Sequence, residues 1–228
     1  MDRNTVFSIL VVFFIFAGGY TVSADSEQGF TEEELLKLEK EVNEVMNEEL
    51  GQQVQTDDNK VSVDIEETTV ELKEKTLELY NYDKDKIVNA FKQEARELKE
   101  GFSKTDIEVK KVKENSPKGN SLNSLVDNGS YYTAKVWSGI PAMGWGYINQ
   151  DFIGRNSGNK LVGLKLQGNS YGTGLTLGSW THNRSWIDIH KYGVTAGIYM
   201  KGTLSYIFKG SPIKTAPTFL KEISAFDL

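Results

Sequence analysis

The residues best suited to chemistry gather in one stretch, Gly178 to Gly193, which reads GSWTHNRSWIDIHKYG. It contains both histidines of the chain, two of its four tryptophans and the Asp188 carboxylate. Histidines and carboxylates form metal sites and general acid–base pairs. The stretch also alternates apolar and polar residues, as β-strands do. It is therefore either a catalytic or metal constellation or a decorated hairpin, and the strand register distinguishes the two.

A hairpin with the three-residue loop Asn183-Arg184-Ser185 separates apolar from polar side chains cleanly. It pairs His182 with Trp186, whereas a two-residue loop would mix leucines with charged residues on one face. Register follows the face that is buried, so we expect the three-residue loop. The predicted core face carries Leu175, Leu177, Ile187 and Ile189. The predicted opposite face carries Trp180, His182, Trp186, Asp188, His190 and Tyr192.

This register argues against catalysis and against a metal site. His182 and His190 would lie four rungs apart, roughly 13 Å, too far to share a zinc ion with ligand bonds of about 2 Å. Asp188 and His190 are neighbours on one face, but no serine is placed to complete a triad with them. We therefore expect no catalytic residue, no metal and no cofactor. A hydrolase that uses Asp188 and His190 is the least favoured alternative.

The aromatic-polar face is instead predicted to bind a ligand. Aromatic rings stack on sugar rings or peptide side chains, and neighbouring polar groups set the orientation of what is bound. Trp145, in the segment SGIPAMGWG, is expected to extend this face at one edge. The competing interpretation places the tryptophans in the core, where large aromatic residues usually lie.

The C-terminal half, residues 131–228, has the pattern of an antiparallel β-domain. Short alternating segments are separated by NSGN, NSYGTG, NRS and GSP. Strands at this spacing indicate a sandwich or a barrel. Within KLVGLKLQG, the alternation predicts Val162, Leu164 and Leu166 on one face and Lys165 and Gln167 on the other.

The preceding part, residues 25–114, is predicted to be an acidic, helix-rich α+β region, so the whole chain is α+β. Thr31 and Glu34 form a capping box for a helix that ends at Gly51. The alternation around Val61 predicts a short hairpin, and the segment TDIEVKKVKE predicts a strand. Residues 68–82 fit a strand or a helix equally. A second helix is expected over residues 83–102, with one apolar face: Ile87, Phe91, Ala95, Leu98 and Phe102.

The N-terminus predicts export. A short polar start precedes the apolar run from Val6 to Ala17, which suits a signal peptide and is short for a membrane span. Val22-Ser23-Ala24 fits a cleavage site, so we expect residues 1–24 to be removed after Ala24. The chain has no cysteine, and secreted proteins without disulfides are typical of Gram-positive bacteria rather than animals. We therefore expect an extracellular, disulfide-free protein of such a bacterium.

Charge divides the chain near residues 115–130, a segment rich in Asn, Ser, Gly and Pro that is either a linker or a processing site. Residues 25–115 hold 26 acidic and 14 basic residues, while residues 116–228 hold 5 and 11. The first expectation is a non-enzymatic protein that binds a glycan or cell-wall polymer. The alternative is a pro-protein, in which the acidic part masks a basic β-domain that acts on anionic membranes as a toxin or antibacterial agent. Scattered lysines and export argue against nucleic acid as a partner.

Overall fold

The computed structural model describes residues 29–56, 59–112, 130–137 and 146–228. Within them the helices are α1 (Glu32–Leu50), α2 (Glu74–Leu79) and α3 (Lys84–Ser103). The strands are β1 (Gln53–Gln55), β2 (Val61–Val70), β3 (Asp106–Lys111), β4 (Ser130–Trp137), β5 (Tyr147–Ser157), β6 (Lys160–Thr173), β7 (Gly178–His190), β8 (Thr195–Phe208) and β9 (Ser211–Ser224). A single 3-10 turn, η2 (Lys191–Gly193), joins β7 to β8.

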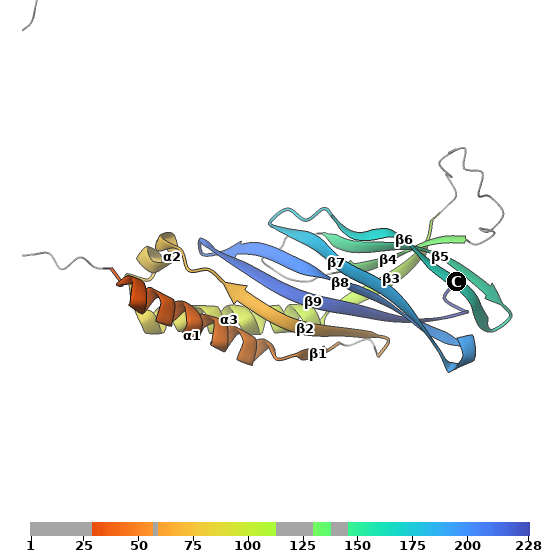
Figure 1. The fold of residues 1–228 in the computed structure, drawn as a ribbon, viewed down its shortest axis with the longest axis horizontal. Helices are drawn as coiled ribbons and strands as arrows, with labels where there is room; N and C mark the ends of the chain where they lie inside the picture. The colour runs from red at the N-terminus through yellow and green to blue at the C-terminus, as the bar shows by residue number, and fades with distance from the viewer. Residues whose placement is uncertain (1–28, 57–58, 113–129, 138–145) are drawn as a thin grey trace, which may run out of the picture.

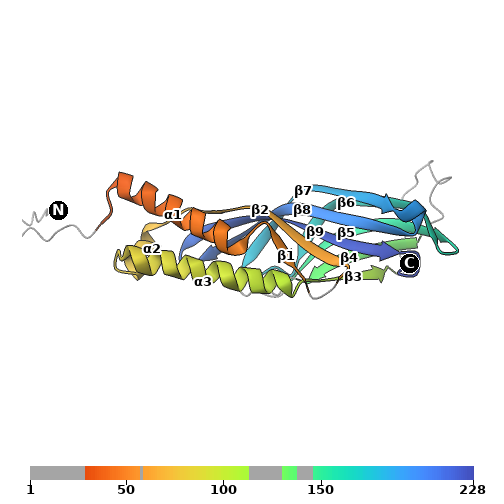
Figure 2. The same ribbon diagram turned by 90° about the horizontal axis from the view of Figure 1, so that it is seen from below.

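The strands form two antiparallel sheets (Figures 1 and 2). Sheet A has the order β1-β2-β9-β8-β7, and sheet B has the order β3-β4-β5-β6. Neither sheet closes on itself over the described residues. The chain is thus mostly β with a few helices, which agrees with an α+β protein and a sandwich-like arrangement of sheets.

One face of sheet A carries the core along the whole length of the molecule. The residues of β8 that turn to this inner face include Ile198, Met200 and Leu204, all buried. Toward the helical end, Phe208 meets Phe91 of α3 at a ring-centroid distance of 5.3 Å. Farther along β7 and β8, the same face meets sheet B. Sheet A therefore acts as a spine that is covered first by helices and then by a second sheet (Figure 2).

The acidic part of the chain contributes strands to both sheets. Strand β2 pairs with β9 over Val61–Val70, and β3 pairs with β4 along its whole length. The buried residues on both sides form one continuous cluster. Residues 1–24 and 115–129 lie outside the described residues, so the expected signal peptide and most of the expected linker do too. The division into residues 25–114 and 131–228 stays a prediction. Strands from the two sides pair with each other in both sheets.

Helix ends and helix faces follow the sequence closely. Thr31 caps α1, and both hydrogen bonds of the capping box with Glu34 are present. Gly51 ends the helix with a φ of 70°, a conformation that glycine adopts without strain. The predicted face of α3 is buried as expected. The predicted hairpin is β1 with β2, and the ambiguous residues 68–82 divide into the end of β2 and α2.

Several predictions about the strands are wrong. The expected hairpin at Asn183-Arg184-Ser185 does not exist, because β7 runs through it as one strand paired with β8. The NSYGTG separator lies mostly within β6, and the chain turns after Thr173 instead. Val162 is exposed because a register shift between Arg155 and Asn156 gives its core position to Leu161. All three errors lie at register shifts, since a bulge reverses the facing of side chains without ending the strand.

Candidate functional site

The bulge at Asn183 reverses the alternation of side chains along strand β7. The aromatic and polar residues before it face inward, and those after it face outward. His182 lies opposite Gly202 of β8, whereas Arg184 lies opposite Lys201, so Asn183 is an extra residue without a partner. An inserted residue shifts the alternation by one and turns all later side chains to the other face. The predicted aromatic-polar face is therefore not one surface.

Before the bulge, the side chains of Trp180 and His182 face inward, between the two sheets. Trp180 lies opposite the buried Leu204 and near Phe219, with ring centroids 6.0 Å apart. Its indole N–H donates to the Ser170 hydroxyl of β6 at 3.0 Å. Gly202 makes this position possible, because a Cβ there would lie 2.3 Å from the Trp180 ring. Trp180 is thus an internal residue that ties sheet A to sheet B, as the core interpretation expected.

His182 belongs to the same internal cluster. Its Nδ1 accepts from the Ser170 backbone N–H at 3.2 Å and lies 2.8 Å from the Ser170 hydroxyl. The Ser170 hydroxyl accepts from the Trp180 indole and lies within hydrogen-bond distance of His182 Nδ1, so it joins the two side chains.

A serine hydroxyl beside a histidine nitrogen resembles half of a catalytic triad, so its accessibility matters. Ser170 is only 4% exposed. Within the described residues, none of the hydrogen bonds of His182 is to a carboxylate that would orient the ring. The Ser170 hydroxyl is also engaged by both Trp180 and His182. We interpret this cluster as a clamp that holds the edges of the two sheets together.

After the bulge, Arg184, Trp186 and Asp188 lie on the outer face of sheet A, where Arg184 and Asp188 are exposed and Trp186 is partly exposed. Trp186 lies opposite Tyr199 of β8, and the two rings are stacked, with centroids 4.6 Å apart and planes inclined by 6°. The Arg184 guanidinium lies 5.2 Å from the Trp186 centroid. The Trp186 indole N–H donates to Asp188 at 3.3 Å. These four residues form what we call the outer cluster: Arg184, Trp186, Asp188 and Tyr199.

The outer cluster is held by its neighbours on sheet A. The Tyr199 ring lies over Gly197, where any Cβ would come within 2.8 Å of it, so the ring rests close to the backbone. Burial, with the nearby Asp188 and Glu222 carboxylates, raises the pKa of Tyr199, so its phenol stays protonated and able to donate. Arg184 and Asp188 are exposed at the rim.

The remaining predicted site residues are not among the four of this cluster. His190 is at the end of β7, opposite Thr195. Tyr192 sits in the turn η2 and is almost fully exposed. Trp145 lies outside the described residues. In the part of the chain that the structure describes, no three His, Asp or Glu side chains gather as a metal ion would need.

Ser170, Tyr199 and Arg184 were not predicted as site residues. Ser170 lies in the segment taken for a turn, and Arg184 lies in the expected hairpin loop. The sequence did contain a signal for the positions of Tyr199 and Trp180. Gly197 and Gly202 interrupt a strand pattern, which indicates that another group approaches the backbone closely at each of them. Both glycines make room for an aromatic ring of the site.

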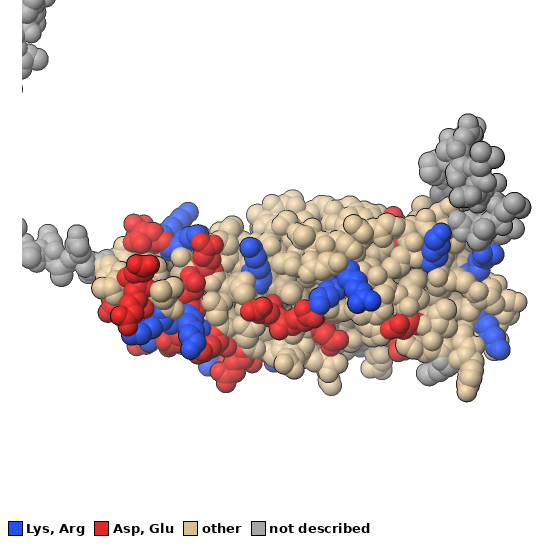
Figure 3. Space-filling view, viewed as in Figure 1, with Lys and Arg blue, Asp and Glu red and all other residues tan. Residues whose placement is uncertain are grey.

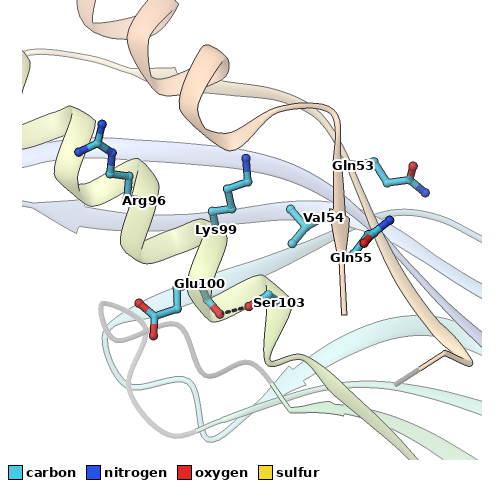
Figure 4. Close-up of a pocket in the computed structure, with 7 residues that line it drawn as sticks. All are labelled: Gln53, Val54, Gln55, Arg96, Lys99, Glu100 and Ser103. Atoms are coloured by element: carbon cyan, nitrogen blue, oxygen red, sulfur yellow. Dashed lines mark hydrogen bonds between the residues drawn. The ribbon is translucent and has the colours of Figure 1, made fainter. Parts of the chain in front are cut away.

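A groove of about 490 Å³ lies elsewhere, between β1 and the end of α3 (Figure 4). Its cations are already engaged, because Arg96 donates to the Glu49 carboxylate and Lys99 to the Glu49 carbonyl. Arg96, together with Lys92, hydrogen-bonds the Glu49 carboxylate and lowers its pKa to about 2. The Ser103 hydroxyl donates to the Glu100 carbonyl, as Figure 4 shows. These contacts thus join α1 to α3. The residues that line the groove include no aromatic ring, unlike the outer cluster.

Comparison with protein-family models, with curated proteins and with solved structures finds no match to this chain. Among the described helices, none is both long and apolar enough to cross a lipid bilayer. Function is therefore inferred from geometry and chemistry.

Proposed function

We propose that the protein is an exported, non-enzymatic binding protein that contacts a glycan or cell-wall polymer through the outer cluster. The observation that carries this proposal is the grouping of Arg184, Trp186, Asp188 and Tyr199 on one solvent-facing part of sheet A. It narrows the site expected from the sequence, because Trp180 and His182 face inward. Trp145, His190 and Tyr192 remain predictions as further contacts at the margins.

The chemistry of the outer cluster suits a sugar. Stacked aromatic rings offer an apolar surface to the C–H face of a pyranose, and fixed polar groups bind its hydroxyls. Arg184 lies over the Trp186 ring, with its guanidinium 5.2 Å from the ring centroid, and it is exposed. A cation over an exposed ring is held by only about 0.5–1 kcal/mol. A sugar ring can therefore take that position while Arg184 and Asp188 turn to its hydroxyls.

Two observations favour binding over hydrolysis. Asp188 interacts with the Trp186 indole, on the opposite side of the sheet from the contact between Ser170 and His182. That contact is buried and its hydroxyl is engaged. Export, a Gram-positive source and the division into an acidic region and a C-terminal β-domain accompany the proposal as expectations from the sequence.

The proposal is tested by replacing Trp186 with alanine and measuring sedimentation of the protein with purified cell wall. We expect binding to weaken about tenfold, since a buried aromatic contact contributes on the order of 1.4 kcal/mol. Ile207→Ala is the matched control, because Ile207 is an exposed apolar residue of the neighbouring strand β8. Wall binding by Trp186→Ala equal to that of the unmodified protein would contradict the proposal.

The masked pro-protein remains the alternative from the sequence, and no observation in the structure favours it. After cleavage near residue 115, release of the β-domain would require β2 to separate from β9, with which it pairs from Val61 to Val70. That separation would expose the backbone edge of β9, which is costly unless another strand replaces β2.

A further inference from the structure

The end of the molecule opposite the helices brings three segments together. These are the β5–β6 turn, the turn η2 between β7 and β8, and the C-terminal residues 225–228 (Figures 1 and 2). Asn156 of β5 donates from its side chain to the Ala225 carbonyl at 2.9 Å. Gly193 of η2 lies against the Leu161 backbone of β6. We call this end the tip.

The tip presents large apolar side chains to solvent. Tyr192 is 99% exposed and Phe226 is 85% exposed. Val162 and Ile189, near the same strand ends, are also more than half exposed. Tyr192 has a φ of 57°, a left-handed conformation that costs energy for any residue but glycine. The turn thus holds an aromatic ring outward at some cost, although a smaller polar residue would be easier to place there.

Charge is distributed unevenly between the two ends. Helix α1 carries eight glutamates and two lysines. Figure 3 shows acidic residues crowded at the helical end, while lysine and arginine are prominent at the tip. Lys160, in the β5–β6 turn, is exposed beside the apolar residues of the tip. A molecule with this distribution turns its tip toward an anionic surface and its helices away from it.

From these observations we propose that the tip docks peripherally on an anionic phospholipid bilayer. Tyr192 and Phe226 enter the interfacial layer, where amphipathic and aromatic rings are favoured. Lys160 lies at the level of the anionic headgroups, which attract cations near the surface. The tip contains none of the four residues of the outer cluster and shares with the predicted glycan site only Tyr192, a marginal contact there, so the proposal does not depend on glycan binding by the outer cluster.

The test uses the chain that begins at Asp25, which holds every described residue. Sedimentation is measured with vesicles of phosphatidylcholine containing about one-third phosphatidylglycerol, and with pure phosphatidylcholine. We expect the unmodified protein to prefer the anionic vesicles and the preference to fall with added salt. The double variant Tyr192→Asn, Phe226→Ser should bind at least about tenfold more weakly. Asparagine is chosen because it tolerates the left-handed conformation.

The matched control is the double variant Leu36→Ser, Leu79→Ser. Leu36 and Leu79 are exposed apolar residues of α1 and α2, at the other end of the molecule. The control should retain the vesicle binding of the unmodified protein, and so should Trp186→Ala. Equal loss in the tip variant and the helical control would overturn the proposal, as would unchanged binding by the tip variant.

A labelled residue gives a second readout that does not depend on loss of binding. The chain has no cysteine, so Tyr192→Cys and Leu36→Cys each create a single site for an environment-sensitive fluorophore. Anionic vesicles should shift the emission of the label at residue 192 to shorter wavelength and leave the label at residue 36 unchanged. A shift that needs no vesicles and grows with protein concentration would assign the tip to a second copy of the chain and overturn the proposal.

Discussion

A single residue, Asn183, decides which side chains of β7 reach solvent. Because it is the extra residue of a bulge, Trp180 and His182 turn inward and Trp186 and Asp188 turn outward. The inner pair converges on Ser170 and joins the sheets. The outer pair is left free to take part in binding. Local backbone irregularity therefore divides one aromatic-polar sequence between the interface of the two sheets and the outer face of sheet A.

Another residue, Glu94 of α3, is buried against the spine of the molecule. Tyr206 of β8 donates to its carboxylate at 2.9 Å. Burial raises the pKa of Glu94, and Glu97 adds to the rise, while the Tyr206 hydrogen bond and Lys209 oppose it. A carboxyl group whose pKa is raised on folding stabilises the folded state below its unfolded pKa, and this stability is lost as the pH rises through the folded value.

Replacing Glu94 with glutamine should therefore flatten the pH dependence of stability. The amide keeps an oxygen that can accept from Tyr206 and removes the charge that becomes costly on ionisation. We expect Glu94→Gln to be more stable than the unmodified protein at neutral pH, with the difference shrinking as the pH falls through the raised folded pKa toward the ordinary value of 4.5 and vanishing below it. Urea unfolding at several pH values measures this difference. A difference that stays constant with pH would show that Glu94 ionises freely in the folded state.

At the scale of elements, side chains of α1 form the backbone hydrogen bonds along part of β2 that a neighbouring strand would otherwise form. Strand β1 is short, so within the described part of the chain no strand pairs with Thr68 and Val70 on the edge of β2 that faces away from β9. Asn47 exchanges two hydrogen bonds with the backbone of Thr68, and Asn43 does the same with Val70. Four helical residues advance about 6 Å and two strand residues about 6.6 Å, so the two ladders match. The helix thereby protects an edge that could otherwise aggregate.

Asn47→Ala should destabilise the protein by about 1–3 kcal/mol, because it leaves the Thr68 N–H and C=O without their partners. Glu48→Ala is the control, since Glu48 is the next residue of α1, is exposed, and has no part in the hydrogen bonds to Thr68 and Val70. Thermal unfolding with matched protein concentrations measures both. Equal stability of the two variants would mean that water satisfies this edge as well as Asn47 does.

The elements that the sequence predicts well are those with local signals. The caps and apolar face of α1 and α3, the β1–β2 hairpin and β3 all depend on neighbouring residues. The failures are non-local: the bulge at Asn183 depends on the pairing of its neighbours His182 and Arg184 with Gly202 and Lys201, which lie far along the sequence. Likewise, Asn43 and Asn47 have the spacing of an ordinary polar helix face, and their role needs the edge of β2. For the site, Trp186 and Asp188 were predicted together, while Tyr199 and the inward turn of Trp180 depended on the register.

At the scale of the whole molecule, the structure is long and its ends differ. Helices and acidic residues occupy one end, and the exposed apolar tip occupies the other (Figures 1 and 3). The outer cluster lies on sheet A between them. This arrangement suits a protein that meets an extended surface, with a glycan at its side and an anionic bilayer at its tip.

The central claim, that Trp186 contacts a glycan while Trp180 does not, is tested most directly by nuclear magnetic resonance. The four tryptophans give separate indole N–H signals, and Trp186→Phe and Trp180→Phe assign the two that matter. On titration with soluble cell-wall glycan fragments, we predict that the Trp186 signal shifts with ligand concentration and the Trp180 signal stays in place. A Trp186 signal that does not move at saturating fragment, in a folded protein, would contradict the account.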